Sequence, residues 1–194
     1  MSMAGRAIKR VIDVAASALL LLVGWPALLA IALWIRLDSR GPAVFRQERA
    51  GRNMKPFLMY KFRTMRTDVA PFGVSPTGAD DVRLTRVGRR LREASLDELP
   101  QLWNILKGDM SLVGPRPLYM SQTREFTERQ RRRLEVRPGL TGLAQVQGRG
   151  EIPHEEKLEI DVAYVQRASL RLDLRILWRS AAAFVGRKKV YQKW

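Results

Sequence analysis

The chain has 194 residues, of which 46% are hydrophobic and none is cysteine. That length supports one core of ordinary size and argues against two full domains. The absence of cysteine excludes disulfides, thiolate zinc sites and a cysteine nucleophile. Lys and Arg number 35 against 19 Asp and Glu, a formal charge of +16. We therefore expect a partner that carries phosphate, and nucleic acid, an anionic bilayer and a phosphorylated substrate are all compatible with this charge.

An apolar segment occupies residues 14–35, where no side chain is charged. At a helical rise of about 1.5 Å per residue, a segment of this length crosses a bilayer core of roughly 30 Å. No small-residue cleavage site follows, so we interpret the segment as retained rather than as a cleaved signal. Pro26 lies near its middle and removes one helical hydrogen bond, which predicts a kink.

Basic residues flank both ends of the apolar segment. Arg6, Lys9 and Arg10 precede it, and Arg36, Arg40, Arg46 and Arg49 follow it. The positive-inside tendency therefore draws both ends to the cytoplasmic side. A kinked helix that enters one leaflet and returns satisfies both ends, and a straight spanning helix is the alternative. In either case we expect the rest of the chain to lie in the cytoplasm.

We predict a mostly α-helical fold with a small β-hairpin. A re-entrant membrane helix with its flanks occupies residues 1–40, and a compact cytoplasmic catalytic domain occupies residues 41–194. The hairpin is predicted from apolar runs at 43–45 and 57–60, which flank a polar stretch with Gly51. The proline and glycine residues between 69 and 81 predict a loop.

Helical periodicity predicts further helices over about 87–94, 97–108 and 121–136, and another near the C-terminus. Gly108 suits a left-handed C-cap. The last helix has arginines at every fourth residue beside a separate apolar face. It therefore lies either on an anionic membrane surface, with Trp178 at the headgroup level, or packed on the domain. The arginines are Arg171, Arg175 and Arg179, and the apolar face holds Leu174, Leu177, Ala181 and Phe184.

The acidic pair Asp97-Glu98 is the first candidate for chemistry. Pro100 lacks an N–H and fits best in a first helical turn, which places the helix start at about Asp97. Unpaired backbone N–H groups there should favour ionised carboxylates. An ionised carboxylate can act as a nucleophile or bind a divalent cation. The alternative is structural, because Ser95 and Glu98 also match a capping box.

Arginines and Gly-Pro turns surround this acidic pair. Proline-stiffened loops hold an arginine with little entropy left to lose, and a guanidinium binds phosphate oxygens in a bidentate fork. The pattern therefore favours a diphosphate ligand, although a solvated surface charge is the alternative for each arginine. The residues are Arg83, Arg86, Arg89, Arg90 and Arg92 before the pair, then Arg116 in a Gly-Pro-Arg-Pro turn and Arg137 in an Arg-Pro-Gly turn.

Five motifs in a fixed order resemble those of the bacterial sugar transferases known as monotopic phosphoglycosyl transferases. They are YKFRTM at 60–65, SLDELPQL at 95–102, NILKGDMS at 104–111, VGPRP at 113–117 and RPGLTG at 137–142. The resemblance runs from the apolar segment to about residue 173. Two positions depart from the family's usual pattern, since Trp25 precedes Pro26 and a Gln-Gly-Arg ending at Arg149 replaces Asn-Gly-Arg.

The resemblance implies a re-entrant helix kinked at Pro26 and a two-step reaction. Asp97 attacks the β-phosphate of a UDP-sugar and expels UMP, and undecaprenyl phosphate, a polyprenyl phosphate, then accepts the phosphosugar. Such a step commits a sugar to the membrane in exopolysaccharide, capsule, O-antigen or glycoprotein glycan synthesis. It places the protein at the bacterial inner membrane, with its catalytic domain on the cytoplasmic face and anionic lipids as partners.

The resemblance also assigns residues. Asp97 and Glu98 are the expected catalytic residues and the expected ligands of Mg²⁺ (magnesium), while Glu98 is also a candidate to position the acceptor or to manage a proton. The expected phosphate or nucleotide contacts are Lys61, Arg63, Arg92, Arg116, Arg137 and Arg149. The sugar carried and the formation of a homodimer are left open.

Two other classes of protein fit the composition. A membrane-anchored nucleic-acid-binding protein fits the charge, but the arginines cluster around acidic residues and rigid turns instead of following one helix face with stacking aromatics. We therefore expect no nucleic-acid partner. A membrane scaffold without activity fits the apolar segment. Neither class would release UMP from a UDP-sugar.

Overall fold

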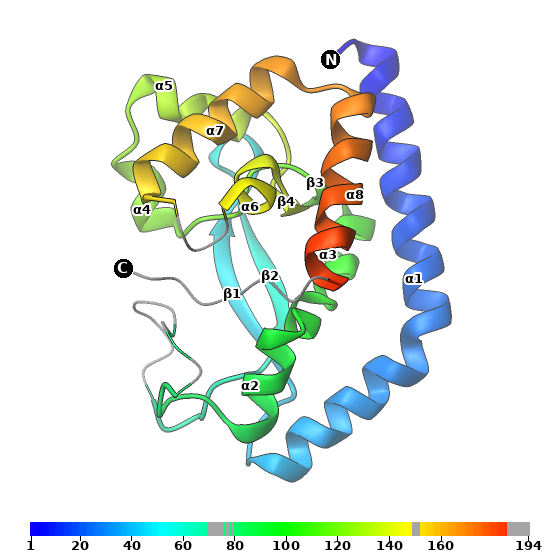
Figure 1. The fold of residues 1–194 in the computed structure, drawn as a ribbon, viewed down its shortest axis with the longest axis vertical. Coiled ribbons are helices and arrows are strands. Elements are labelled where there is room, and N and C mark those ends of the chain that lie inside the picture. Colours follow the sequence, from blue (N-terminus) through cyan, green and yellow to red (C-terminus); the bar gives the residue numbers. More distant parts are fainter. Residues whose placement is uncertain (70–75, 77, 79, 149–151, 186–194) are drawn as a thin grey trace.

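The computed structural model describes residues 1–69, 76, 78, 80–148 and 152–185. Helices surround one antiparallel hairpin, and a second, shorter sheet lies beside it (Figure 1). The elements are α1 (Met3–Asp38), β1 (Val44–Ala50), η1 (Arg52–Met54), β2 (Pro56–Phe62), α2 (Arg86–Glu93), η2 (Leu96–Glu98), α3 (Gln101–Lys107), β3 (Ser111–Val113), α4 (Met120–Arg124), α5 (Glu128–Arg131), η3 (Arg132–Glu135), β4 (Gly139–Thr141), α6 (Leu143–Gly148), α7 (His154–Arg167) and α8 (Leu170–Val185).

The predicted hairpin is confirmed and is longer than its apolar runs. β1 and β2 pair antiparallel from Val44 opposite Phe62 to Ala50 opposite Pro56. Phe62 and Ala50 lie on the same face at opposite ends of the hairpin. Phe62 packs in a core that includes α1, and Ala50 packs in a core without it. On the other face, Met59 and Phe57 pack in a cluster that also includes Ala16 and Leu21 of α1.

Helix α1 is the candidate membrane element. It is long and apolar enough to cross a membrane, and only 6% of its most apolar window is buried. Pro26 lies inside it, and the helix bends part way along its length (Figure 1). The exposed apolar surface indicates an anchor rather than a core helix of a soluble domain.

A few polar contacts attach α1 to the rest of the protein. The buried Asp13 carboxylate accepts a hydrogen bond from the Leu112 backbone N–H at 3.0 Å. Lys9 forms an ion pair with Asp173 of α8 at 2.7 Å, and the Tyr164 hydroxyl donates to the other Asp173 oxygen, also at 2.7 Å. The candidate membrane helix α1 is thus attached to the rest of the fold by polar contacts at its N-terminal part.

The region around the acidic pair differs from the prediction. No α-helix starts at Asp97, because residues 96–98 form the 3₁₀ turn η2 and α3 begins only after Pro100. The predicted end is confirmed, since Gly108 adopts a left-handed conformation with φ 93°. The predicted helix at 87–94 is confirmed as α2.

The single helix predicted over 121–136 is wrong. The chain instead forms α4, α5 and η3 in succession. Thr127 interrupts the helix because its hydroxyl accepts a hydrogen bond from the Gln130 N–H, and the Gln130 side chain accepts from the Thr127 N–H. This capping box starts a new helix where periodicity alone predicts a continuous one.

The two Gly-Pro turns lie side by side, which the sequence did not predict. Strands β3 and β4 pair in parallel, and the Gly114 N–H donates to the Thr141 carbonyl at 2.9 Å. The approach requires glycine, because a Cβ added to Gly139 would lie 2.1 Å from the Gly114 nitrogen. Turns that begin 23 residues apart, at Gly114 and Arg137, are thereby joined.

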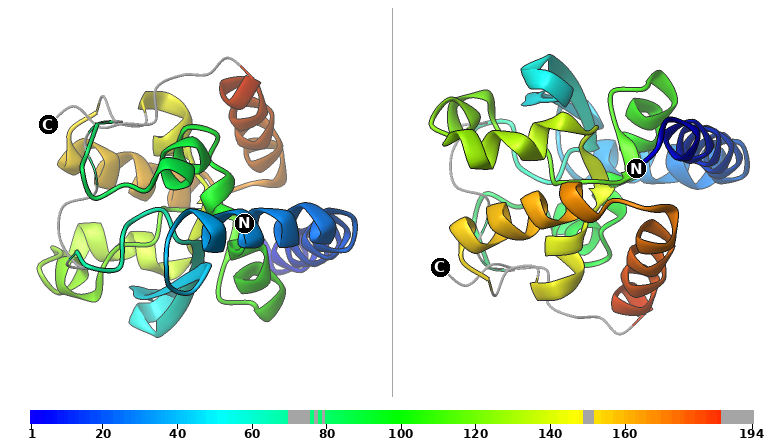
Figure 2. Two further views of the ribbon diagram at one scale, coloured as in Figure 1. Left: turned by 90° about the horizontal axis from the view of Figure 1, so that it is seen from below. Right: turned by 90° about the horizontal axis from the view of Figure 1, so that it is seen from above.

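The predicted C-terminal helix is confirmed as α8. It packs through buried Ile176 and Asp173, and it exposes Leu174 and Trp178. Figures 1 and 2 place α8 on the same side of the molecule as α1. One face of α8 therefore packs on the domain, as one of the two alternatives predicted, and the exposed Leu174 and Trp178 leave contact with a membrane surface as a prediction.

Candidate active site

Asp97 lies in the turn between α2 and α3. Ser95, two residues before Asp97, has a left-handed backbone with φ 52° and makes no side-chain cap, so the capping box that was the structural alternative does not form. Asp97 is only 8% exposed. Within the part of the chain that the structure describes, its carboxylate makes neither a hydrogen bond nor an ion pair. A carboxylate buried without a partner is rare and marks a candidate functional group.

The electrostatics at Asp97 correct a second expectation. Burial raises the pKa of the Asp97 carboxyl, and the positive charges of Lys61 and Arg92 only partly offset this effect. The sequence predicted the opposite direction, because it placed Asp97 at the start of an α-helix. In the observed turn Asp97 has no α-helix N-terminus to stabilise its charge, and burial disfavours the ionised form. A cation that enters the site would therefore stabilise the Asp97 carboxylate.

Glu98 behaves in the opposite way. One of its oxygens accepts hydrogen bonds from Lys61 Nζ at 2.8 Å and from Arg116 Nη2 at 2.9 Å. Burial raises the pKa of Glu98, but the charges of Arg116 and Lys61 outweigh it and hold that pKa well below the usual range. The two adjacent carboxyls thus have different environments. Glu98 forms ion pairs with two cations, whereas Asp97 forms none with the described residues.

Lys61 is positioned by hydrogen bonds that join β2 to α3. The fully buried Asn104 side chain accepts from the Tyr60 N–H at 3.0 Å and donates to the Leu58 carbonyl at 2.7 Å. It therefore pairs with the edge of β2 as another strand would. Asn104 is the first residue of the NILKGDMS motif, and no role was predicted for it.

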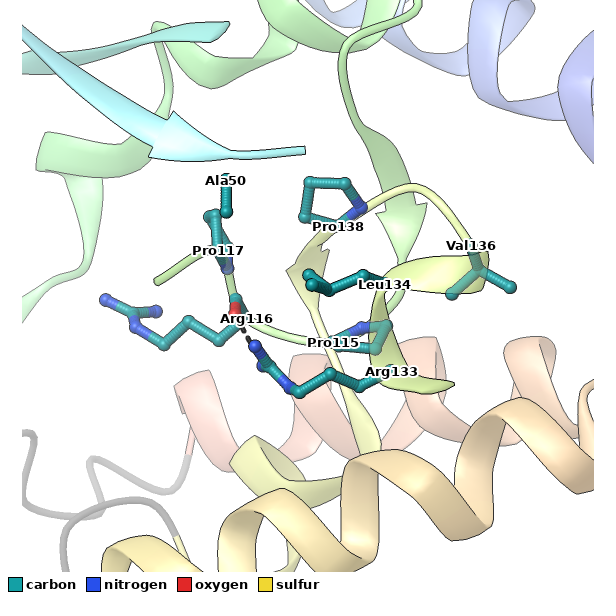
Figure 3. Close-up of a pocket in the computed structure, with 8 residues that line it drawn as sticks. All are labelled: Ala50, Pro115, Arg116, Pro117, Arg133, Leu134, Val136 and Pro138. Atoms are coloured by element: carbon teal, nitrogen blue, oxygen red, sulfur yellow. Dashed lines mark hydrogen bonds between the residues drawn. The ribbon is translucent and has the colours of Figure 1, made fainter. Parts of the chain in front are cut away.

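Arg116 is held through its backbone. Arg133 Nη2 donates to the Arg116 carbonyl at 2.7 Å, and the same guanidinium forms an ion pair with Asp161 of α7 at 2.6 Å. Figure 3 shows Arg133 reaching this carbonyl while the Arg116 side chain points to the other side of the chain. A small pocket surrounds the contact, lined by Ala50, Pro115, Arg116, Pro117, Arg133, Leu134, Val136 and Pro138.

The structure brings together some of the predicted phosphate contacts. Lys61, Arg92 and Arg116 all lie within electrostatic reach of Asp97. Arg92 comes from α2, and its side chain has no hydrogen-bond or ion-pair partner among the described residues. Arg149 lies outside the described residues.

Two predicted contacts lie elsewhere. Arg63 is buried, and its guanidinium donates to the carbonyls of Pro42, Ser39 and Met65. Arg137 donates to the Gly108 carbonyl at 2.7 Å, at the opposite end of α3 from Asp97. Both side chains donate to backbone carbonyl oxygens away from Asp97, so the structure does not bring them together with the acidic pair.

Two cations near the site were not predicted. The charges of Arg49 and Lys157 both interact with that of Arg116. In the sequence, Arg49 is one of two arginines on β1, and Lys157 lies in a run of charged residues. Nothing local distinguishes them from solvated surface charges.

The donor set restricts how Mg²⁺ could bind. No group of three metal-ligating side chains occurs among the residues described. Of the two predicted ligands, Glu98 is occupied by cations, which leaves Asp97. Because Mg²⁺ usually binds through one or two carboxylates together with substrate phosphates, the residues fit an ion shared with a phosphorylated substrate, not one held by the protein alone.

A buried free carboxylate ringed by cations, beside an exposed apolar helix, indicates an enzyme that handles phosphorylated substrates at a membrane. Residues 4–187 match the family model described as bacterial sugar transferase. The chain belongs to the bacterial sugar transferase family.

Three relatives illustrate the likeness. The uncharacterized sugar transferase EpsL of Bacillus subtilis is 48% identical, with 88% of this chain and 83% of EpsL aligned. The UDP-glucose:undecaprenyl-phosphate glucose-1-phosphate transferase of Caulobacter vibrioides is 46% identical over 94% of this chain and 72% of its own. The exopolysaccharide production protein PSS of Rhizobium leguminosarum is 41% identical over 94% and 97%. Some relatives are longer, and this chain covers only 34% of one from Komagataeibacter xylinus.

Proposed function

We propose that the protein transfers a phosphosugar from a UDP-sugar to undecaprenyl phosphate, through a covalent intermediate on Asp97 and with release of UMP. The names of relatives support the donor and acceptor classes, since the Caulobacter protein is a UDP-glucose:undecaprenyl-phosphate glucose-1-phosphate transferase. The observation that carries the covalent step is the contrast within the acidic pair. Glu98 is tied to Lys61 and Arg116, whereas Asp97 beside it is unpaired.

The first step forms a bond between an Asp97 carboxylate oxygen and the β-phosphorus of the donor. The bond from that phosphorus to the bridging oxygen breaks, and its electron pair leaves with UMP. Lys61, Arg92 and Arg116 lie where they can bind the negative oxygens of the transferred group. Glu98 keeps two of these cations in place without competing for the phosphorus.

In the second step a phosphate oxygen of the acceptor attacks the same phosphorus. The bond to Asp97 breaks, which regenerates the carboxylate and yields the polyprenyl diphosphosugar. The two-step route lets one site at the membrane edge treat a soluble donor and a lipid acceptor in turn. Mg²⁺ bound by Asp97 and the donor phosphates would neutralise the crowded phosphate oxygens.

The membrane arrangement belongs to the same proposal. The bend in α1 and its exposed apolar surface support a helix that enters one leaflet and returns, with the catalytic domain on the cytoplasmic face. Exposed Trp178 and Leu174 on α8 support contact with the headgroup region on the same side.

Donor-only incubation tests the covalent step. Purified protein in detergent is mixed with a panel of UDP-sugars and Mg²⁺ without acceptor, and intact mass and peptide mapping are recorded. We expect one phosphosugar on the peptide that contains Asp97 and UMP in equal amount, and neither with Asp97→Asn. UMP release only when acceptor is present, with no adduct, would contradict the covalent route. No release under either condition would contradict the transferase activity itself.

A further inference from the structure

Arg49 carries a positive charge that forms no ion pair with Asp97 or Glu98. It lies on β1 and forms no ion pair with any acidic side chain in the described part of the chain. Its Nη2 donates to the Gln47 side-chain oxygen at 2.5 Å, and among the described residues its buried Nε has no hydrogen-bond partner. A partly buried cation whose Nε is unsatisfied is costly unless an anion completes it.

The surroundings of Arg49 hold it in one orientation. Its guanidinium stacks on the Tyr119 ring at 3.6 Å from the centroid. Gln47 binds both members of this stack, because its amide nitrogen donates to the Tyr119 hydroxyl at 3.2 Å. The backbone N–H of Ala50 donates to the Leu118 carbonyl at 3.0 Å, which fixes β1 beside the segment that follows Arg116. The guanidinium is therefore preorganised.

Arg49 continues a row of charges that begins at Lys61. The two residues share one face of the hairpin, because Phe45 is opposite Lys61 and lies four residues before Arg49. At roughly 3.4 Å per residue their backbones are about 14 Å apart along the strand. Glu98 and Arg116 connect them, since both bear on the charge of Arg49 and Glu98 binds Lys61 directly.

This row contains more cationic than anionic side chains, so its positive charges are only partly neutralised. Burial and the charge of Arg116 lower the pKa of Arg49 to about 10. Burial and Arg116 likewise lower the pKa of Lys157 on α7. Lys157 also lacks an ion-pair partner among the described residues. A ligand with more than one phosphate would relieve this repulsion.

The position of Arg49 along the hairpin indicates which phosphate it meets. The Lys61 end of the hairpin packs with α1 through Phe62. Next to Arg49, Ala50 packs in a cluster with Phe126, Leu134 and Leu158 that contains no α1 residue, and Leu158 adjoins Lys157. Arg49 and Lys157 thus flank a cluster built by the domain itself, which favours a phosphate of the soluble donor over a lipid phosphate carried by the membrane.

We propose that Arg49 and Lys157 form a second phosphate subsite, which binds the phosphate that stays with the nucleoside when the donor is cleaved. The inference rests on the proposed function and adds a subsite to it. As the β-phosphorus is captured, negative charge develops on the oxygen that leaves with UMP, and these two cations stabilise it. Lys61, Arg92 and Arg116 then bind the phosphate oxygens of the transferred phosphosugar.

Binding of UMP and of uridine separates phosphate recognition from recognition of the base. Each Arg49 variant is made in the Asp97→Asn protein, so that no turnover occurs, and affinities are measured by calorimetry in detergent. For Arg49→Gln and Lys157→Gln we expect UMP affinity to fall on the order of 10- to 100-fold, with uridine binding unchanged. Arg49→Lys, which keeps the charge but not the stack, should lose less.

The matched control is Arg46→Gln. Arg46 lies on the same strand but on the opposite face, where it is exposed near the Tyr60 ring, so its variant should bind UMP as the parent does. Steady-state kinetics with Asp97 intact should show a raised KM for the donor and an unchanged KM for undecaprenyl phosphate. Thermal unfolding of each variant identifies any that has lost its fold.

Three outcomes decide the matter. Parental UMP affinity in folded Arg49 and Lys157 variants would overturn the subsite. A raised KM for the lipid with unchanged UMP affinity would assign these cations to the acceptor and overturn it as well. If Arg49-dependent UMP binding is found but donor leaves no adduct on Asp97, the covalent mechanism fails and the subsite stands.

Discussion

Replacing Asp161 by Asn should destabilise the protein strongly, although Asp161 is not proposed to touch substrate. Its Oδ2 accepts from Arg133 at 2.6 and 3.2 Å, and the two side chains are only 5% and 2% exposed. Removing one partner leaves a buried guanidinium without its counter-charge, which costs about 3–5 kcal/mol. That is a large part of a typical unfolding free energy of about 5–15 kcal/mol. Chemical unfolding in detergent, followed by fluorescence, measures the loss.

A double variant separates stability from positioning. In Arg133→Met with Asp161→Leu both charges are gone, and apolar replacement of a buried pair is often neutral or stabilising by about 1–4 kcal/mol. The Arg116 carbonyl nevertheless loses its 2.7 Å donor. We therefore expect near-normal stability with UMP release reduced about 10-fold, equivalent to one hydrogen bond of roughly 1.4 kcal/mol.

A matched control lies on the same helix. Glu159 pairs with Arg129 at 2.8 Å, but these side chains are 46% and 66% exposed, so Glu159→Gln should change stability by no more than about 0.5 kcal/mol. A loss in Asp161→Asn as small as in this control would refute the reasoning about the buried pair. A double variant as active as the unmodified protein would refute the role of Arg133 in placing Arg116.

Three other perturbations test separate parts of the structure. Asn104→Leu should lower the unfolding free energy by about 2–6 kcal/mol in denaturant titrations, because it leaves two backbone groups of β2 unsatisfied; a change below 1 kcal/mol would argue against these hydrogen bonds. Pro26→Ala should straighten α1, and a membrane-impermeant label on the N-terminus should then react from the far side; unchanged labelling would argue against the kink. Adduct formation needs ionised Asp97, whose pKa burial raises above 3.8. Its rate should therefore fall with decreasing pH through a value above 3.8, and Glu98→Gln should move this limb to lower pH by removing a neighbouring negative charge; a limb at or below 3.8 in the unmodified protein would contradict the burial of Asp97.

The sequence predicted the elements whose signals are local. The apolar runs of the hairpin, the periodicity of α2 and α8, and the glycine that ends α3 each lie within a few residues of the structure they determine. The helix over 121–136 failed because a local cap at Thr127 overrides periodicity. The parallel pairing of β3 with β4 failed because three-residue strands carry no pattern of their own.

The same distinction explains the candidate site. The acidic pair with Lys61, Arg92 and Arg116 was predicted from motifs, and these residues do lie together. Arg63 was also predicted as a phosphate contact, yet a guanidinium binds a backbone carbonyl as readily as a phosphate oxygen, and only the fold shows which one is near. The contacts that position the site, such as Arg133 with Asp161, join residues 28 apart in the sequence. No single-sequence pattern marks them.

The different environments of the two adjacent carboxyls explain why the site needs both. If Glu98 were absent, Lys61 and Arg116 would turn to Asp97, because it would be the remaining acidic group within reach of both. A nucleophile held by two strong hydrogen bonds would have to break them before it attacked phosphorus. By taking these cations itself, Glu98 leaves Asp97 desolvated and unpaired, while the cations stay close enough to receive the phosphate. A site made of one carboxylate and the same cations would bind the donor, but its nucleophile would already be engaged.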